Sequence, residues 1–222
     1  MTSRAAIVSA ARSLIDREGW EHLTIRKLAA ELNIGPTTLY HHVKNKQDLL
    51  LLLLNEYAAQ VVVPDLPEAP RDRIVTVTEV LHDTLAAWPW AAEVLTVDGF
   101  LGLLDEPALS IVELIVDAAV DYGCTLEQAV DVFRSLWYYT VGEVLVRAHS
   151  SRGQADGEHL VQRATFHNLE SPRLPRLSAV ASRWRALSAR DIYRQGLEAF
   201  VDGLLAQATA GGTEHNARID DR

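Results

Sequence analysis

Apolar residues recur three or four positions apart along most of the chain, and no segment shows the strict alternation typical of a strand. The spacing predicts helices in the first third of the chain over about 4–17, 25–32, 36–43 and 46–62. Further helices are expected over 71–88, from Ala91 onward, and over 106–123, 125–149, 177–187 and 189–208, with Ser188 and Asp191 capping the last. We therefore predict an all-α protein.

Two short helices joined by a sharp turn lie between Leu23 and Leu50. Thr24 suits an N-cap, Asn33 and Gly35 tolerate the left-handed backbone of a sharp turn, and Pro36 suits the first position of a helix. This order predicts a helix-turn-helix, whose second helix enters the major groove of DNA. A solvated helical hairpin without any DNA partner is the alternative interpretation of the same pattern.

Polar and basic side chains occupy the outward positions of this motif. Hydroxyl groups of Thr and Tyr can reach phosphates or base edges, and basic groups would lie along the phosphate backbone. The predicted DNA-binding residues are Arg26, Lys27, Thr37, Thr38, Tyr40, His42, Lys44 and Lys46.

The segments LTIRKLAAEL and TTLYHHVKNKQDLL, with Glu18-Gly19-Trp20 before them, strongly resemble the DNA-binding head of the tetracycline-repressor (TetR) family of bacterial regulators. The resemblance implies an N-terminal three-helix head followed by a larger helical domain for ligand binding and dimerisation. It also implies operator contacts at Arg26, Thr37, Thr38, Tyr40, His42 and Lys46. Pro36 replaces the base-reading polar residue that tetracycline-responsive members often carry, so no operator sequence is carried over.

Charge is distributed unevenly along the chain. The formal net charge of −9 argues against a general nucleic-acid coat protein. Residues 1–50 contain seven Lys or Arg against five Asp or Glu, whereas the remainder contains 14 basic and 25 acidic residues. A mildly basic head on an acidic body suits a specific operator binder that avoids other DNA.

The compartment follows from three further features of the sequence. The single cysteine, Cys124, precludes an internal disulfide and fits a reducing environment. No signal-peptide pattern begins the chain, and no apolar run approaches the roughly twenty residues that span a membrane. We expect a soluble cytoplasmic protein with no membrane partner.

The proline-rich segment 65–70 marks the expected domain boundary. We assign residues 1–63 to the head with its connecting helix, 64–209 to the ligand-binding and dimerisation domain, and 210–222 to a disordered tail. The run Leu49–Leu54 is apolar all round, which predicts a helix wedged between head and body. Residues 150–157 are polar and glycine-rich, which predicts a mobile loop, and the fold of 158–176 stays open.

Two long helices, 125–149 and the last one, have features of a dimer interface. The last carries an apolar stripe, and glycines inside both helices suggest the close approach of another backbone. In the resembled family these helices pair with their two-fold copies in a four-helix bundle, which supplies the two heads that a palindromic operator requires. The predicted interface residues are Gly142, Tyr193, Gly196, Leu197, Phe200 and Leu204.

The body is rich in large aromatic residues, which either fill the core or line an apolar ligand site with few polar groups. The predicted ligand-binding residues are His82, Trp88, Phe100, Phe133, Trp137 and His149. No pair of these histidines has the spacing of helical metal ligands, so we predict no metal and no other cofactor. Cys124, near a helix N-terminus, is either a redox-sensing thiolate or a packed thiol.

Together these features predict a ligand-responsive transcriptional repressor. As a homodimer it would bind palindromic double-stranded operator DNA, and a small apolar or aromatic effector would release it. The alternatives are an activator of the same fold, or a small-molecule-binding protein or enzyme with an idle helix-turn-helix. No phosphate-binding loop or nucleophile motif is present, so we expect no enzymatic activity. The effector, the operator and the regulated genes are not evident from the sequence.

Overall fold

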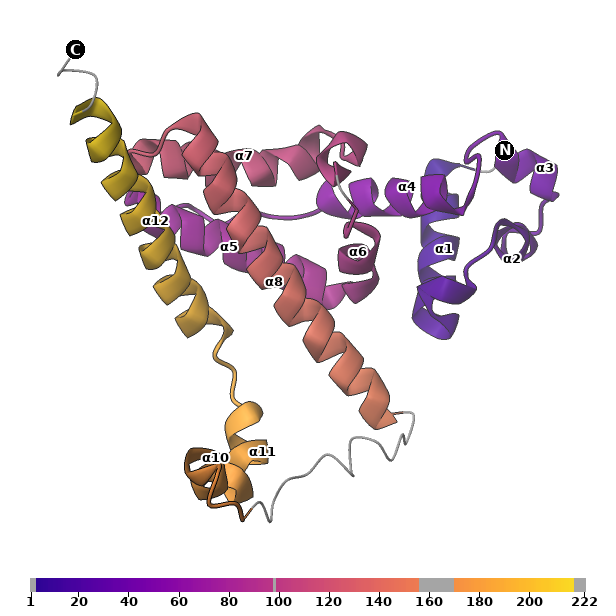
Figure 1. The fold of residues 1–222 in the computed structure, drawn as a ribbon. Coiled ribbons are helices and arrows are strands. Elements are labelled where there is room, and N and C mark those ends of the chain that lie inside the picture. Colours follow the sequence, from indigo (N-terminus) through magenta and orange to yellow (C-terminus); the bar gives the residue numbers. More distant parts are fainter. Residues whose placement is uncertain (1–2, 98, 156–169, 218–222) are drawn as a thin grey trace.

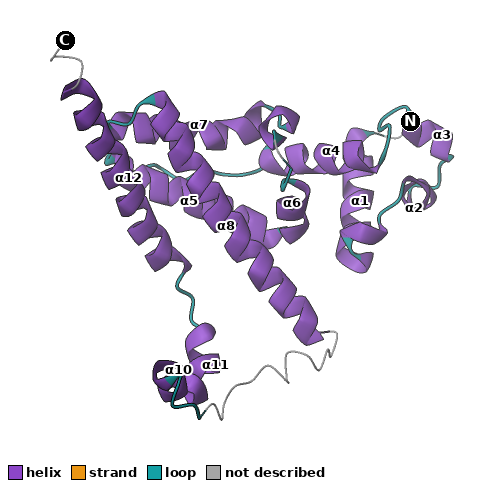
Figure 2. Cartoon of the chain, viewed as in Figure 1, coloured by secondary structure: helices purple, strands orange, loops and turns teal. Residues whose placement is uncertain are grey.

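The computed structural model describes residues 3–97, 99–155 and 170–217, and every regular element in these ranges is helical, as predicted. A small head lies at one end of the molecule, and α4 joins it to a larger body of long helices (Figures 1 and 2). Within the described ranges, no helix combines the length and the hydrophobicity needed to cross a bilayer.

The head consists of three helices and a 3-10 turn: α1 (Arg4–Glu18), η1 (Trp20–His22), α2 (Ile25–Glu31) and α3 (Pro36–Tyr40). Side-chain hydroxyls cap the first two helices, since Ser3 Oγ accepts a hydrogen bond from the Ala6 amide and Thr24 Oγ1 accepts one from the Lys27 amide. Ile7, Leu28 and Leu39 are fully buried where the three helices meet. Local capping and a small apolar core therefore define the head.

The turn between α2 and α3 depends on Asn33, which has a left-handed φ of 53°. The amide of Ile34 donates to the carbonyl oxygen of Ala29 at 2.9 Å, which closes α2. Gly35 has a φ of −69°, so the expected left-handed backbone occurs at Asn33 and not at Gly35. Pro36 takes the first position of α3, as predicted.

Helix α4 (Lys46–Ala58) links the head to the body. Asn45 caps it, with Oδ1 accepting from the Asp48 amide at 2.8 Å. Leu49 and Leu53 are fully buried, while Leu51 and Leu52 are half-buried. The leucine run is thus covered on most sides. The helix ends at Ala58 rather than near the expected Val62, and residues 61–67 have no regular structure.

The body contains α5 (Pro70–Ala87), α6 (Pro89–Val94), η2 (Phe100–Leu103), α7 (Glu106–Tyr122), α8 (Leu126–Ala155), α10 (Pro175–Val180), η3 (Ala181–Arg183), α11 (Trp184–Ser188) and α12 (Tyr193–Ala217). Helices α5, α7 and α8 pack against one another, and α12 packs against α5 and α8. The short helices α10 and α11 lie beyond the far ends of α8 and α12 (Figure 1). Fully buried side chains from Ile74, Ile115, Leu136 and Leu197 form the centre of this core.

Three boundaries in the second half of the chain differ from the predictions. Helix α8 continues to Ala155, so residues 150–155 are helical and do not form the expected loop. Gly153 costs the helix only about 1 kcal/mol relative to alanine, which is too little to end so long a helix. Helix α12 starts at Tyr193, whose amide donates to Asp191 Oδ1, while Ser188 ends α11 instead of capping the last helix. Helix α12 also extends to Ala217, through most of the expected tail. The remainders of the expected loop and tail, 156–157 and 218–222, and residues 158–169 lie outside the described ranges.

Candidate nucleic-acid interface and ligand cavity

Helix α3 presents polar side chains on the outer side of the head. Leu39 and Val43, 0% and 3% exposed, anchor the helix and the turn that follows it. Hydroxyl and imidazole groups in an exposed row can donate and accept hydrogen bonds at phosphates and base edges. The predicted contact residues that lie exposed are Thr37, Thr38 and Tyr40 on α3 and His42 in the turn after it, because α3 ends at Tyr40 and not at the expected residue 43.

Two of the predicted basic contacts, Arg26 and Lys44, are exposed. Neither side chain forms an ion pair within the part of the chain that the structure describes. The backbone amide of Lys44 donates to Asp48 Oδ2 at 3.1 Å, which fixes the chain without using the ammonium group. Both cations can therefore approach a phosphate.

The other two basic side chains, Lys27 and Lys46, have partners inside the head. Lys27 Nζ pairs with Glu18 Oε2 at 2.6 Å, and this hydrogen bond lowers the pKa of the Glu18 carboxyl. Lys46 Nζ donates to the Glu21 carbonyl oxygen at 2.8 Å and lies 5.0 Å from the centre of the Trp20 ring. These contacts hold the helices of the head together and would have to loosen before either lysine reached DNA.

An apolar cavity of about 70 Å³ lies in the body between α4, α5, α6, η2, α7 and α8. Four of the six predicted ligand residues line it, namely Trp88, Phe100, Phe133 and Trp137. No charged side chain belongs to the lining, and the hydroxyl of Thr84 already donates to the Val80 carbonyl oxygen at 2.7 Å. The cavity therefore suits an uncharged, apolar group.

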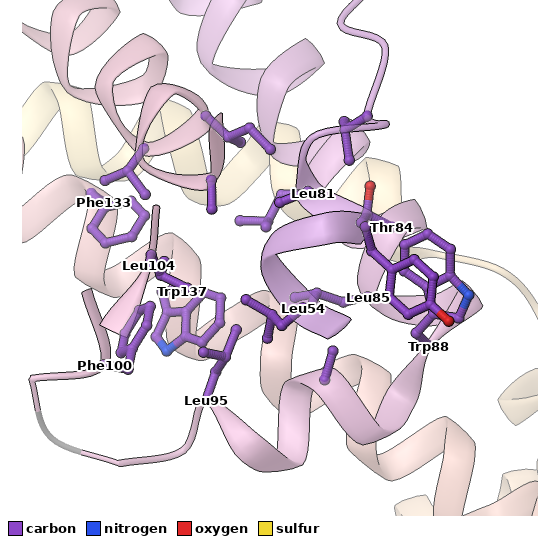
Figure 3. Close-up of a pocket in the computed structure, with 17 residues that line it drawn as sticks. Leu54, Leu81, Thr84, Leu85, Trp88, Leu95, Phe100, Leu104, Phe133 and Trp137 are labelled. Carbon is purple, nitrogen blue, oxygen red and sulfur yellow. The ribbon is translucent and has the colours of Figure 1, made fainter. Parts of the chain in front are cut away.

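Stacked aromatic pairs lie at the two ends of this cavity. Phe100 and Trp137 stack at one end with ring centroids 4.5 Å apart, and Trp88 lies at the other (Figure 3). Trp88 in turn stacks on Tyr57 of α4 at 4.2 Å, and burial of that tyrosine raises its pKa. Helix α4 thus forms part of the cavity wall with Leu54, Tyr57 and Ala58, none of which is among the predicted ligand-binding residues.

His82 and His149 do not lie on the wall of this cavity, which corrects their prediction as ligand residues. The His82 ring stacks on Tyr193 with centroids 3.8 Å apart, and its Nε2 hydrogen-bonds Glu143 Oε2 at 2.8 Å. His149 is exposed and lies 3.9 Å from a Glu93 carboxylate oxygen.

Two of the predicted dimer residues, Tyr193 and Leu197, belong to the core of the subunit itself. Tyr193 is 5% exposed, its hydroxyl shares a 2.8 Å hydrogen bond with Thr140 Oγ1, and burial raises its pKa. Leu197 is fully buried. Neither is free to face a partner, which corrects that part of the prediction.

The remaining predicted dimer residues differ in what surrounds them. A Cβ at Gly196 would lie 2.2 Å from Tyr139 Oη, so this glycine makes room for a side chain of its own subunit. Gly142 is exposed with nothing within 4 Å of such a Cβ. Phe200 is 36% exposed and Leu204 is half-buried, which leaves an apolar patch on α12 open to solvent.

Metal and thiol chemistry find little support among the described residues. In those ranges, no group of three His, Cys, Asp or Glu side chains is placed to hold a metal ion. The Cys124 side chain is buried, and burial raises the pKa of its thiol. The geometry therefore favours the packed thiol over the redox-sensing thiolate.

Two protein-family models together match nearly the whole chain. A family model described as "Bacterial regulatory proteins, tetR family" matches residues 7–53, and one described as "Tetracyclin repressor-like, C-terminal domain" matches residues 63–208.

Individual relatives agree with these matches. The tetracycline repressor protein class E of Escherichia coli is 28% identical over 204 residues, which cover 90% of this chain and 90% of that protein. An HTH-type transcriptional regulator of Saccharopolyspora erythraea is 42% identical over 88 residues, covering 39% of this chain and only 37% of that relative. Among solved structures, the Streptomyces coelicolor TetR family protein ActR in complex with actinorhodin matches 93% of this chain and 98% of its own, with 25% identity and a TM-score of 0.76.

Proposed function

The chain belongs to the TetR family of bacterial transcriptional regulators, and we propose that it acts there as a ligand-responsive repressor that binds a palindromic operator as a homodimer. A small apolar or aromatic effector in the body would release it from DNA. One observation carries the proposal: α4 leaves the DNA-binding head and forms part of the cavity wall. Head position and cavity occupancy therefore depend on the same helix.

The head supplies the DNA contacts in this proposal. Thr37, Thr38, Tyr40 and His42 would reach base edges and nearby phosphates from the major groove, with Arg26 and Lys44 on flanking phosphates. Two heads related by a two-fold axis must lie about 34 Å apart to meet successive major grooves. A shift of α4 in each subunit changes this separation and weakens binding.

The dimer in this proposal uses the exposed apolar side chains of α8 and α12. Phe200, Leu204 and Gly142 remain available after the subunit core has taken Tyr193 and Leu197. Tyr139 of α8 lies against Phe200, with ring centroids 5.5 Å apart, so the patch extends across both helices. A two-fold copy of the same patch would cover it, as in an isologous interface.

The effector acts through its preference for one state of the protein. A ligand shifts an equilibrium only by its differential affinity for the two states, and about 5.5 kcal/mol is needed to move it from 1:99 to 99:1. The cavity gives such a difference a physical basis, because a ligand larger than about 70 Å³ must displace Leu54, Tyr57 or their neighbours. The solved complex of ActR with actinorhodin supports small-molecule binding by a protein of this fold.

Selection of genomic DNA fragments by the purified protein tests the proposal. The wild type should enrich one inverted repeat, and Tyr40→Ala should lose that enrichment because Tyr40 is 53% exposed on α3. Tyr122→Ala is the matched control, since Tyr122 is 43% exposed at the end of α7 in the body. Equal enrichment by wild type and Tyr40→Ala, or no inverted repeat at all, would count against operator binding through α3.

A further inference from the structure

Asn55 is a half-buried polar residue that directly follows the leucine run of α4. Its Oδ1 accepts a hydrogen bond from the Asp105 amide at 3.0 Å, and its Nδ2 donates to the Leu103 carbonyl oxygen at 3.4 Å. Both bonds require the same orientation of the carboxamide, because the opposite one would set oxygen against oxygen and N–H against N–H. Among the described residues, Asn55 is the only α4 side chain that hydrogen-bonds the body.

The two hydrogen bonds lie on either side of Leu104. This residue joins the end of η2 to Asp105, the N-cap of α7, and has an extended backbone with a φ of −94° and a ψ of 142°. The Leu104 side chain lies on the wall of the apolar cavity (Figure 3). Asn55 therefore holds the backbone immediately before and immediately after a cavity residue, so a displacement of Leu104 acts on the carboxamide.

The chemistry of this contact differs from that of the other α4 contacts at the cavity. Apolar contacts such as the stack of Tyr57 on Trp88 are held largely by the hydrophobic effect, which has no preferred direction. A hydrogen bond weakens steeply when its angle closes. Two hydrogen bonds from one carboxamide to both sides of Leu104 therefore oppose movement of that segment relative to α4.

The opposite connection of α4, to the head, begins beside Asn55. Glu56 Oε1 lies 2.6 Å from Arg4 Nε of α1. Leu49 and Leu53, nearer the start of the helix, are fully buried. A movement that reaches Asn55 therefore reaches the head through a single helix that is fixed along its length.

We propose that Asn55 is the positioning residue that couples the apolar cavity to the DNA-binding head. An effector that displaces Leu104 carries the carboxamide with it, and so moves α4 until the two heads no longer fit the operator. The inference rests on the proposed function, because it takes operator release as the response to an occupied cavity.

Substitutions at Leu104 test the proposal without any effector. Leu104→Lys must turn out of the apolar cavity, because burial of an unpaired charge is costly, and Leu104→Phe displaces the same segment more mildly by overpacking. Each should weaken binding of the selected operator about tenfold when Asn55 is present and less than about twofold in an Asn55→Leu background. Fluorescence anisotropy measures the affinities, and thermal unfolding shows which variants are folded.

Gln60→Leu is the matched control, since the Gln60 amide donates to the Glu56 carbonyl oxygen of its own segment at 3.1 Å. In that background the Leu104 variants should keep their full effect. A merely structural Asn55 would lower the thermal midpoint without changing how strongly the Leu104 substitutions affect operator affinity.

Equal weakening with and without Asn55 would overturn the proposal, as would an unchanged operator affinity in the folded Leu104 variants. Failure of the proposed function gives a different result. In that case the DNA-fragment selection yields no operator for the wild type, and this inference falls with it. Additive effects on an established operator would overturn this inference alone.

Discussion

The Tyr57 ring stacks on the Trp88 ring with centroids 4.2 Å apart and an angle of 19° between the planes. Tyr57 lies near the end of α4, which leaves the DNA-binding head, and Trp88 follows the last residue of α5 in the body. Both line the apolar cavity. Because stacked aromatic pairs contribute about 0.5–1.5 kcal/mol beyond burial, this contact can transmit a change in the cavity to the head.

Substitution of Tyr57 by Leu should uncouple the effector from DNA release. Leucine keeps an apolar group in the buried site but removes the stack, so operator affinity without effector should change little. The effector concentration for half-release should rise about two- to tenfold, the equivalent of the lost stacking energy. Fluorescence anisotropy of labelled operator, titrated with a compound that releases the wild type, measures both quantities.

Tyr122→Leu provides the control for this experiment, because Tyr122 lies outside the cavity and is exposed at the end of α7. It should respond to effector as the wild type does. If Tyr57→Leu also kept the wild-type response, the signal would have to pass through other α4 contacts, such as Leu54.

Arg26 and Lys27 should differ in their contributions to the salt dependence of operator binding. Arg26 is exposed and unpaired within the described ranges, whereas Lys27 is held by Glu18 at 2.6 Å. Each phosphate contact contributes about 0.9 to the slope of log K against log salt concentration. Arg26→Gln should therefore reduce the slope by about that amount, while Lys27→Gln should leave it nearly unchanged. An equal reduction in both variants would mean that Lys27 exchanges Glu18 for a phosphate on binding.

The head was predictable from sequence because its signals are local. Thr24 caps α2 within one turn, Asn33 adopts the left-handed backbone by itself, and Pro36 opens α3. No contact with a distant part of the chain is needed for any of these, so residue type and spacing were sufficient.

The ligand cavity was only half predictable, because its walls come from segments far apart in the chain. From the sequence, Trp88 and His82 were equally plausible as cavity residues. Only the packing of α8 and α12 decides that His82 turns to Glu143 and Tyr193. No feature of the sequence marked Tyr57 as a cavity residue, because its place there depends on its contact with Trp88 across the boundary between head and body.

Gly196→Ala should destabilise the subunit. The added methyl would lie 2.2 Å from Tyr139 Oη, and the overpacking cost of about 1–3 kcal/mol exceeds the gain of about 1 kcal/mol in helix propensity. Chemical denaturation measures the loss. Tyr139→Phe in the same chain should recover part of it, because the clashing oxygen is gone.

Gly203→Ala is the matched control on the same helix. Nothing lies within 4 Å of a Cβ at this position, so the substitution should raise the free energy of unfolding by up to about 1 kcal/mol. Destabilisation at Gly203 together with a tolerated Gly196→Ala would show that a partner, and not Tyr139, explains the glycines of α12.

Phe200→Glu should convert the proposed homodimer into monomers. Phe200 is 36% exposed on α12, so a carboxylate there is solvated in the free subunit but buried and unpaired against a two-fold copy. Sedimentation velocity measures the change, and thermal unfolding should show an intact subunit. Val62→Glu, at an 85% exposed position between α4 and α5, should remain dimeric. A dimeric Phe200→Glu protein would place the interface elsewhere.

The thiol of Cys124 should react slowly and only at high pH. Burial raises its pKa, so at every pH below that value the thiolate fraction is smaller than in free cysteine, and the thiolate is the reactive form. The rate of alkylation by iodoacetamide in the native protein should keep rising at pH values where the rate of free cysteine has levelled off. In urea, where the side chain is exposed, the two rates should converge. A fast native reaction that levels off below pH 8 would instead indicate a lowered pKa and would restore the redox-sensing hypothesis for this residue.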